Sequence, residues 1–129
     1  MPNELILIVE DDEKSRKLVR DVLELNGYRT LETETAEEGI RLAQQNQPGL
    51  ILMDIHLPGM SGIDALQALR KDTATGAIPV IAVTASVMTE QQQQVMHAGF
   101  DAMERKPISV SGLVKTVRSV LDRRTSKPV

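Results

Sequence analysis

Acidic side chains stand directly after two short apolar runs of the chain. Glu10 and Asp11 follow the first run, and Asp54 follows another one about forty residues later. If both runs are parallel strands of one sheet, their carboxyl ends meet at one edge, where open α/β sheets bind ligands. Carboxylates gathered there repel one another by roughly 4 kcal/mol per pair at 4 Å. Mg²⁺, which takes oxygen ligands and keeps several waters, relieves that repulsion. The pattern therefore predicts a magnesium site.

A hydroxyl and an amine stand at the ends of two further runs. Thr84 ends one of them, and Lys106 follows the other. An aspartate can attack phosphorus and form an aspartyl phosphate. Beside it, Lys106 can pair with the carboxylate or with phosphoryl oxygens, and the Thr84 hydroxyl can donate to another phosphoryl oxygen. This set of residue types suits transfer of a phosphoryl group to Asp54.

Residues at these strand ends, and Asp12 beside the acidic pair, also have ordinary structural explanations. Asp12 can cap the start of a helix or complement its dipole. Asp54 can form a turn, Thr84 can simply favour a strand, and Lys106-Pro107 can break a loop. Taken singly, each residue favours its structural explanation. Their coincidence at the ends of four expected strands favours a functional site.

Five units of strand followed by helix are expected to position these residues. Apolar or alternating segments predict strands at 5–9, 28–33, 50–53, 79–83 and 101–105. Helical spacing of apolar residues, with start and stop signals such as the Thr35-x-x-Glu38 capping box, predicts helices that include 18–23, 36–43, 63–69, 87–96 and 109–121. Such alternation implies right-handed crossovers and a parallel sheet covered on both faces, a three-layer α/β fold. We expect one domain over 1–129, with a flexible polar tail at 123–129.

Length and composition exclude several classes of protein. At 129 residues the chain is long enough for one domain. It has no cysteine, which excludes a disulfide framework, a thiolate zinc site and a cysteine nucleophile, and which fits the reducing cytoplasm where we expect it. No apolar run approaches the ~18 residues of a membrane span. A net charge of −3 and only two aromatic residues, Tyr28 and Phe100, argue against a nucleic-acid partner, so no direct DNA binding is expected.

Four motifs together resemble the receiver domain of two-component response regulators, of the single-domain type. They are Ile8-Val9-Glu10-Asp11-Asp12, Leu52-Met53-Asp54-Ile55-His56-Leu57-Pro58-Gly59-Met60-Ser61-Gly62, Val83-Thr84-Ala85 and Lys106-Pro107. The resemblance runs from about Leu5 to Leu121. It implies a flavodoxin-like fold of five β–α units, in which the central parallel sheet has the strand order 2-1-3-4-5.

The resemblance also implies roles for the residues around the expected magnesium site. Asp54 is the implied phosphoacceptor. Asp11 is the implied direct metal ligand and Glu10 acts through water, with Asp54 and the backbone carbonyl of His56 as further ligands. Asp12 falls one place beyond this acidic pair.

Further roles follow for residues that couple the site to a response. The resemblance implies that Thr84 is the switch hydroxyl and Lys106 the coupling lysine, and that a cis peptide bond precedes Pro107. Met103 stands where the family usually has Tyr or Phe. A flexible thioether cannot take the place of a rigid ring, so we expect both conformations to be populated without phosphate and phosphorylation to shift their ratio only in part. The alternative is that Met103 only packs.

The expected protein is a phosphoacceptor and not an enzyme with a separate substrate. It takes a phosphoryl group from a phosphohistidine of a sensor histidine kinase or a phosphotransfer protein, and it assists its own phosphorylation and dephosphorylation. Its output is binding to an unidentified protein through the face formed by the fourth and fifth helices.

Three alternatives remain open from the sequence. A phosphatase of the haloacid-dehalogenase type would use Asp54 as nucleophile, although His56 stands where its second acid belongs. A flavodoxin-like cofactor binder would need a phosphate-cradling loop, and no G-x-G-x-x-G or Walker loop is present. The last alternative is a receiver-like module that is never phosphorylated.

Overall fold

The computed structural model describes residues 4–85 and 98–125, and strands and helices alternate along them. The strands are β1 (Leu5–Val9), β2 (Arg29–Thr33), β3 (Leu50–Asp54), β4 (Val80–Thr84) and β5 (Ala102–Arg105). The helices are α1 (Glu13–Leu25), α2 (Ala36–Asn46), α3 (Gly62–Lys71) and α5 (Val110–Thr125). The helix predicted over 87–96 lies outside the described residues.

The strands form one parallel sheet in the order β2-β1-β3-β4-β5, which confirms the predicted order. Strands β3 and β4 are buried along their whole length and β1 along nearly all of it. Burial on both faces explains why these three segments are continuous apolar runs. The chain passes from β1 to β2 on one side and then to β3 on the other. The boundary between β1 and β3 is therefore the topological switch point, where ligands of such sheets bind.

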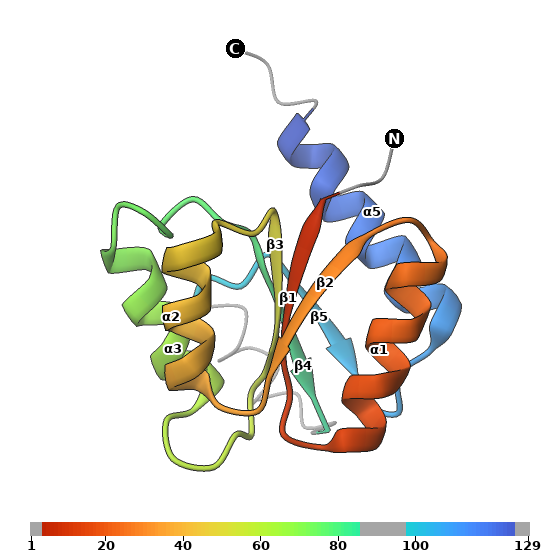
Figure 1. Cartoon of the computed structure of the whole chain (residues 1–129), viewed down its shortest axis with the longest axis horizontal. Helices are drawn as coiled ribbons and strands as arrows, with labels where there is room; N and C mark the ends of the chain where they lie inside the picture. Colours follow the sequence, from red (N-terminus) through yellow and green to blue (C-terminus); the bar gives the residue numbers. More distant parts are fainter. Residues whose placement is uncertain (1–3, 86–97, 126–129) are drawn as a thin grey trace.

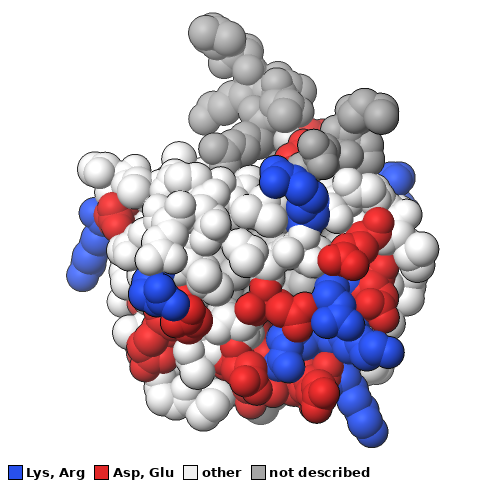
Figure 2. Space-filling view, viewed as in Figure 1, with Lys and Arg blue, Asp and Glu red and all other residues white. Residues whose placement is uncertain are grey.

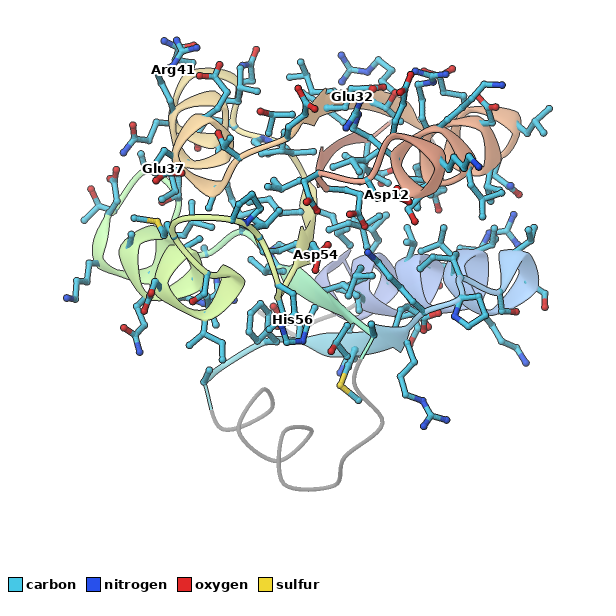
Figure 3. The ribbon with its side chains drawn as sticks, turned by 90° about the horizontal axis from the view of Figure 1, so that it is seen from below. Asp12, Glu32, Glu37, Arg41, Asp54 and His56 are labelled. Atoms are coloured by element: carbon cyan, nitrogen blue, oxygen red, sulfur yellow. The ribbon has the colours of Figure 1, made fainter. Side chains whose placement is uncertain are left out.

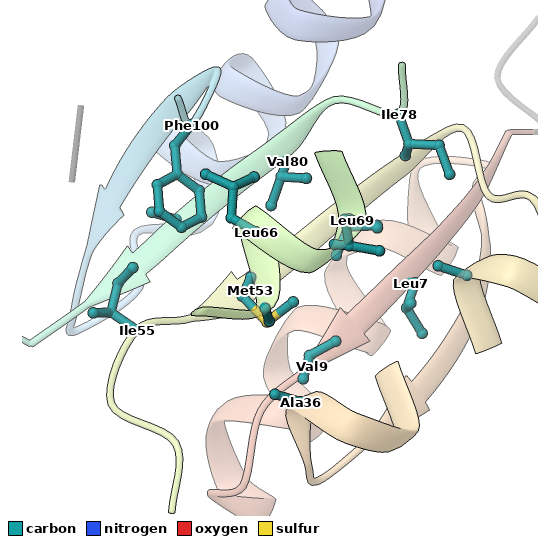
Figure 4. Packing of buried hydrophobic residues seen from close by; sticks show 14 of the residues in the cluster. Leu7, Val9, Ala36, Met53, Ile55, Leu66, Leu69, Ile78, Val80 and Phe100 are labelled. Carbon is teal, nitrogen blue, oxygen red and sulfur yellow. The ribbon is translucent and has the colours of Figure 1, made fainter. Parts of the chain in front are cut away.

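Helices cover both faces of the sheet and create two separate hydrophobic cores. Helices α1 and α5 lie on one side, and α2 and α3 lie on the other (Figure 1). Alternate β1 residues point to opposite sides: Leu7 enters the core beneath α2 and α3, shown in Figure 4, and Ile8 enters the core beneath α1 and α5. Each core contains one aromatic residue, Phe100 in the first and Tyr28 in the second.

Side chains cap the helices that begin near the carboxyl edge of the sheet. Asp12 caps α1 by accepting a hydrogen bond from the backbone N–H of Ser15 at 3.0 Å. Thr35 caps α2 by accepting from Glu38 N–H at 3.2 Å, as its sequence pattern predicts. Ser61 caps α3 in the same way. These caps fix where each loop from a strand enters the following helix.

Some predicted boundaries are wrong by a few residues. Strand β2 begins at Arg29, because the Tyr28 N–H donates to the Leu23 carbonyl of α1 at 3.1 Å and not to the neighbouring strand. Helix α5 continues through Thr125, past residue 121 where the predicted helix ends. The Arg123 guanidinium donates to the Asp101 carbonyl at 3.2 Å and ties this last turn to the β5 side. None of the described helices, α5 included, has the length and apolar character needed to cross a bilayer.

Candidate functional site

The carboxyl ends of four strands bring the predicted site residues together. These residues are Glu10 and Asp11 after β1, Asp54 at the end of β3, Thr84 at the end of β4 and Lys106 after β5. Figure 3 looks onto this edge from below and shows Asp54 near the middle of the sheet, with Asp12 and His56 to either side of it. Glu10, Asp54 and Thr84 are each at most 4% exposed, so the polar centre of the site is buried.

The acidic side chains face one another, and one amine lies between two of them. Carboxylate oxygens of Glu10, Asp11 and Asp54 all lie within 4.8 Å of one another. The Lys106 Nζ atom is 2.8 Å from Glu10 Oε1 and 3.1 Å from Asp54 Oδ2. A single ammonium group therefore serves as counter-ion to two buried carboxylates.

This crowding changes the pKa of Glu10 and the pKa of Lys106. Burial, reinforced by the contact with Asp54, raises the pKa of Glu10 from 4.5 to about 7. Burial opposes the charged form of Lys106, but the contacts with Glu10 and Asp54 prevail and raise the pKa of the amine. Lys106 therefore stays charged at neutral pH, whereas Glu10 keeps its proton to a higher pH than an exposed glutamate does.

Strand β3 and the loop after it hold Asp54 in place. The backbone N–H of His56 donates to Asp54 Oδ1 at 2.8 Å, while Oδ2 faces Lys106. The N–H of Ile55 donates to the Val83 carbonyl at 2.9 Å, so the pairing with β4 continues past the aspartate. Both carboxylate oxygens therefore have fixed directions at the edge of the sheet.

The donor set fits a divalent metal ion. Three carboxylates and one ammonium leave a formal charge of −2 when the acids are ionised. All the available donors are oxygens, which suits Mg²⁺ better than a soft metal. Within residues 4–85 and 98–125 no other group of three acids or histidines comes this close together.

Asp12 lies beside this cluster and has a structural role. Its Oδ2 accepts from Ser15 N–H, and the Ser15 side chain, followed by this N–H, lowers the pKa of the Asp12 carboxyl. Its own backbone N–H donates to Glu10 Oε2 at 3.1 Å. The capping explanation weighed for Asp12 from the sequence is therefore confirmed, and the residue also helps to orient Glu10.

The residues expected to couple the site to a response lie on β4 and β5. The Lys106 N–H donates to the Thr84 carbonyl at 2.8 Å, so the two strand ends are directly joined. Met103 is half-buried, pairs in register with Ala82 and packs against the core beneath α2 and α3. The Lys106–Pro107 peptide bond is cis, in agreement with the expectation from the resemblance.

Two residues near the site were missed from the sequence. Arg16 on α1 contacts the carbonyl of Glu10 and the carboxylate of Glu32, which lies on β2. Sixteen positions separate Arg16 from Glu32. No helical or strand spacing relates them, and only the placement of β2 beside β1 brings them together.

Comparison with known proteins decides the family. The family model described as "Response regulator receiver domain" matches residues 6–118. The chain belongs to this family. Receiver domains are the phosphoacceptors of two-component signalling. The membership speaks against the phosphatase and the cofactor-binder alternatives.

Curated relatives of this receiver are response regulators named for polar differentiation. The chain is 42% identical over 116 residues to the "Polar-differentiation response regulator DivK" of Brucella ovis, and equally to that of Brucella abortus. The alignment covers 90% of this chain and 94% of each relative. The similarity therefore extends over nearly the whole of these proteins.

Solved receiver structures share the fold of this chain. The receiver domain of the Francisella response regulator 1452 has a TM-score of 0.87 at 29% identity and covers 95% of this chain and 99% of its own. The receiver domain of sensor histidine kinase PA1611 from Pseudomonas aeruginosa has a TM-score of 0.85 at 25% identity, with 92% and 98% coverage. That structure has a magnesium ion coordinated in its active-site cleft.

Proposed function

We propose that Asp54 accepts a phosphoryl group from a phosphohistidine on a sensor histidine kinase or a phosphotransfer protein. The observation that supports this most directly is the surroundings of its carboxylate. One oxygen accepts the His56 N–H at 2.8 Å and the other lies 3.1 Å from the Lys106 amine, at an acidic edge of the sheet. A nucleophile with fixed oxygen directions and a neighbouring cation suits attack on an anionic phosphoryl group.

In the transfer step an Asp54 oxygen attacks phosphorus. The new bond joins oxygen and phosphorus, and the bond between phosphorus and the imidazole nitrogen of the donor breaks. The imidazole nitrogen keeps the electron pair and takes a proton from water. Lys106, already beside Asp54 Oδ2, then pairs with a phosphoryl oxygen, and the Thr84 hydroxyl donates to another.

Asp11, Asp54 and the His56 carbonyl would hold Mg²⁺ directly, and Glu10 would hold it through water. A bound Mg²⁺ neutralises charge between the carboxylate and the incoming phosphoryl oxygens. The arrangement of oxygens within 4.8 Å and the formal charge of −2 support this assignment.

The same site would remove the phosphoryl group slowly. Water attacks phosphorus, the bond to Asp54 breaks, and the carboxylate and inorganic phosphate are released. Because this reaction returns the protein to its starting state, it sets the lifetime of the signal and needs no separate substrate.

We also place the protein in the cytoplasm, in keeping with its lack of cysteine.

Phosphorylation would shift a two-state equilibrium and so change binding to an output protein. Thr84 and Lys106 would carry this change, since their strand ends are joined by a hydrogen bond. Met103 would make the shift more gradual, because a thioether has no single buried position. Replacement by Tyr should sharpen it, seen as a larger difference in partner affinity with and without a phosphoryl mimic. An unchanged difference would leave Met103 with a packing role.

The test of this function is phosphorylation by a small phosphodonor with Mg²⁺, read by intact mass. We expect the native chain to gain one phosphoryl group and Asp54→Asn to gain none. Asp21→Asn, which changes an exposed aspartate on α1, is the matched control and should be modified like the native chain. A native chain that gains no mass would point to a receiver that is never phosphorylated. Equal modification of Asp54→Asn would place the acceptor elsewhere.

A further inference from the structure

Arg16 connects the acidic pair of the site to the edge strand of the sheet. Its Nη1 atom donates to the Glu10 carbonyl at 3.0 Å, and its Nε atom donates to Glu32 Oε1 at 3.1 Å. The Arg16 side chain is only 15% exposed. Acidic and basic side chains mingle over α1 and β2 in Figure 2, at the lower right of the view. The guanidinium thus bridges a backbone carbonyl and a carboxylate with two different nitrogens.

Glu32 is itself a fixed anchor. It belongs to β2, where it pairs in register with Ile8 of β1. Its second oxygen, Oε2, accepts from Arg20 Nη1 at 3.1 Å. Figure 3 shows Glu32 away from Asp54, at the β2 side of the sheet. A carboxylate on a paired strand with a cation at each oxygen offers Arg16 a rigid partner.

The Glu10 backbone is therefore connected to β2 twice, directly through its N–H and through Arg16 at its carbonyl. Its N–H donates to the Thr33 carbonyl at 3.0 Å, and its carbonyl accepts from Arg16. That carbonyl is half of the peptide group between Glu10 and Asp11. Because the peptide group is planar, holding this carbonyl also holds the Asp11 N and Cα atoms, from which the Asp11 side chain extends. Asp11 is exposed, so its direction depends on the backbone more than on packing.

We propose that Arg16 is a positioning residue for the metal site, holding the Glu10–Asp11 peptide so that both carboxylates face Asp54. This inference rests on the proposed function, because it assumes that Mg²⁺ binds at these acids. Residues that orient metal ligands from behind typically contribute 10-fold to 100-fold in metal affinity. We expect Arg16 to contribute at the lower end of this range.

The positive charge of Arg16 and its hydrogen bond to the Glu10 carbonyl predict opposite changes in Mg²⁺ affinity when Arg16 is removed. A positive charge near three carboxylates repels Mg²⁺, so its loss alone would strengthen metal binding. Loss of the hydrogen bond to the Glu10 carbonyl frees the peptide and would weaken metal binding. The sign of the change in Mg²⁺ affinity therefore distinguishes the two roles.

The experiment is a Mg²⁺ titration of the metal-free native chain and three variants, followed by calorimetry and by backbone amide shifts near Asp54. Arg16→Ala should weaken Mg²⁺ binding about 10-fold. Arg16→Lys keeps the charge but cannot reproduce the planar fork, and it should also weaken binding. Lys17→Ala is the matched control, because it removes an exposed cation from the neighbouring position of α1. Its affinity should equal or slightly exceed that of the native chain.

The outcomes separate this inference from the proposed function. A native chain that binds no Mg²⁺ overturns the metal site itself. A native chain that binds Mg²⁺, with Arg16→Ala binding equally or more tightly, overturns the positioning role alone. Equal weakening in Lys17→Ala would also overturn it. If Arg16→Ala does not fold, Arg16→Lys is the deciding variant. A Mg²⁺ affinity equal to that of the native chain in Arg16→Lys would overturn the positioning role.

Discussion

At the residue scale, the notable feature is that Lys106 is shared between two buried carboxylates. Its amine lies 2.8 Å from Glu10 and 3.1 Å from Asp54, and both acids are almost fully buried. Burial, together with the contact with Asp54, raises the pKa of Glu10, because one cation does not fully offset the cost of burying two ionised acids. The metal-free site is therefore electrostatically unfavourable, and a divalent ion would relieve it.

The first prediction follows from the raised pKa of Glu10. Below pH 4.5 this carboxyl is protonated in the folded and unfolded chain alike. Between pH 4.5 and about 7 the unfolded chain loses the proton first, so the free energy of unfolding falls as the pH rises. The loss is complete well above pH 7 and amounts to about 3 kcal/mol. In Glu10→Gln this fall should disappear. Relative to the native chain, the variant should therefore be more stable at pH 8 and nearly equally stable at pH 5.

Urea denaturation in a metal chelator from pH 5 to pH 8 measures this effect. Glu37→Gln, an exposed acid on α2, is the control and should follow the native profile. The difference between each variant and the native chain isolates the substituted group, because the other titrating residues are common to all three proteins. Parallel profiles for Glu10→Gln and the native chain would show that Glu10 titrates normally.

The second prediction concerns the loss of the Lys106 amine. Lys106→Ala leaves Glu10 and Asp54 facing each other without the counter-ion that Lys106 supplies. The metal-free protein should lose about 2–3 kcal/mol of stability at pH 8, and excess Mg²⁺ should restore most of it. Asp54 should still accept phosphate from a small donor, while partner affinity with a phosphoryl mimic should fall toward the unmodified value. Lys115→Ala, an exposed lysine on α5, should change none of these measurements.

At the element scale, the close contact between β3 and the start of α3 fixes Asp54. Gly62 opens α3, and its N–H donates to the Ile55 carbonyl at 3.1 Å. A Cβ atom at Gly62 would lie 2.5 Å from the Asp54 carbonyl oxygen and 2.9 Å from Ile55 Cα. Both of these are backbone atoms, which cannot turn aside. Only glycine lets the helix begin this close to the strand.

The third prediction is therefore that Gly62→Ala displaces the end of β3. We expect a loss of about 1–3 kcal/mol in stability and a slower gain of phosphate at Asp54, measured by thermal unfolding and intact mass. Gly49→Ala is the control, because its new Cβ meets Glu4 side-chain carbons at 3.4 and 3.5 Å and the Leu5 carbonyl oxygen at 3.8 Å, all ordinary contact distances. Equal behaviour of the two variants would show that the close approach at Gly62 has no role in placing Asp54.

Sequence patterns predicted the strands and helix starts well, because apolar periodicity and capping depend on residues close together in the chain. The runs that became β1, β3 and β4 are buried on both faces, and the Thr35 box capped α2 as expected. The strand order came from the family resemblance, since no local pattern specifies which strands are neighbours. The contact of Arg16 with Glu32 was not predictable, because it depends on the register of β1 with β2. The end of α5 was misplaced because polar residues such as Arg123 continue a helix when tertiary contacts support it.

At the scale of the whole molecule, the sheet gathers the three carboxylates of the site and Lys106 at one edge and its apolar groups in two layers. Metal binding at that edge should therefore stabilise the entire fold by mass action. The fourth prediction is a rise in the free energy of unfolding of about 2.7 kcal/mol when Mg²⁺ is present at 100 times its dissociation constant. Asp11→Ala should abolish this rise.

The control for that measurement is Asp12→Ser, which removes a neighbouring acid but keeps an oxygen that can cap α1. Thermal unfolding with and without Mg²⁺ should show the rise in this variant as in the native chain. A rise that survives in Asp11→Ala would mean that Mg²⁺ stabilises the protein from another location.

The separation of the two cores also determines how the molecule can be observed by optical spectroscopy. The chain has no tryptophan, one tyrosine and one phenylalanine. Tyr28 is buried in the core beneath α1 and α5, and Phe100 is buried in the core beneath α2 and α3. Ultraviolet emission therefore originates almost entirely from Tyr28, on the α1–α5 side of the sheet. An emission change on phosphorylation would show that the signal crosses to that side, while events confined to the Phe100 side would pass unseen without an added fluorophore.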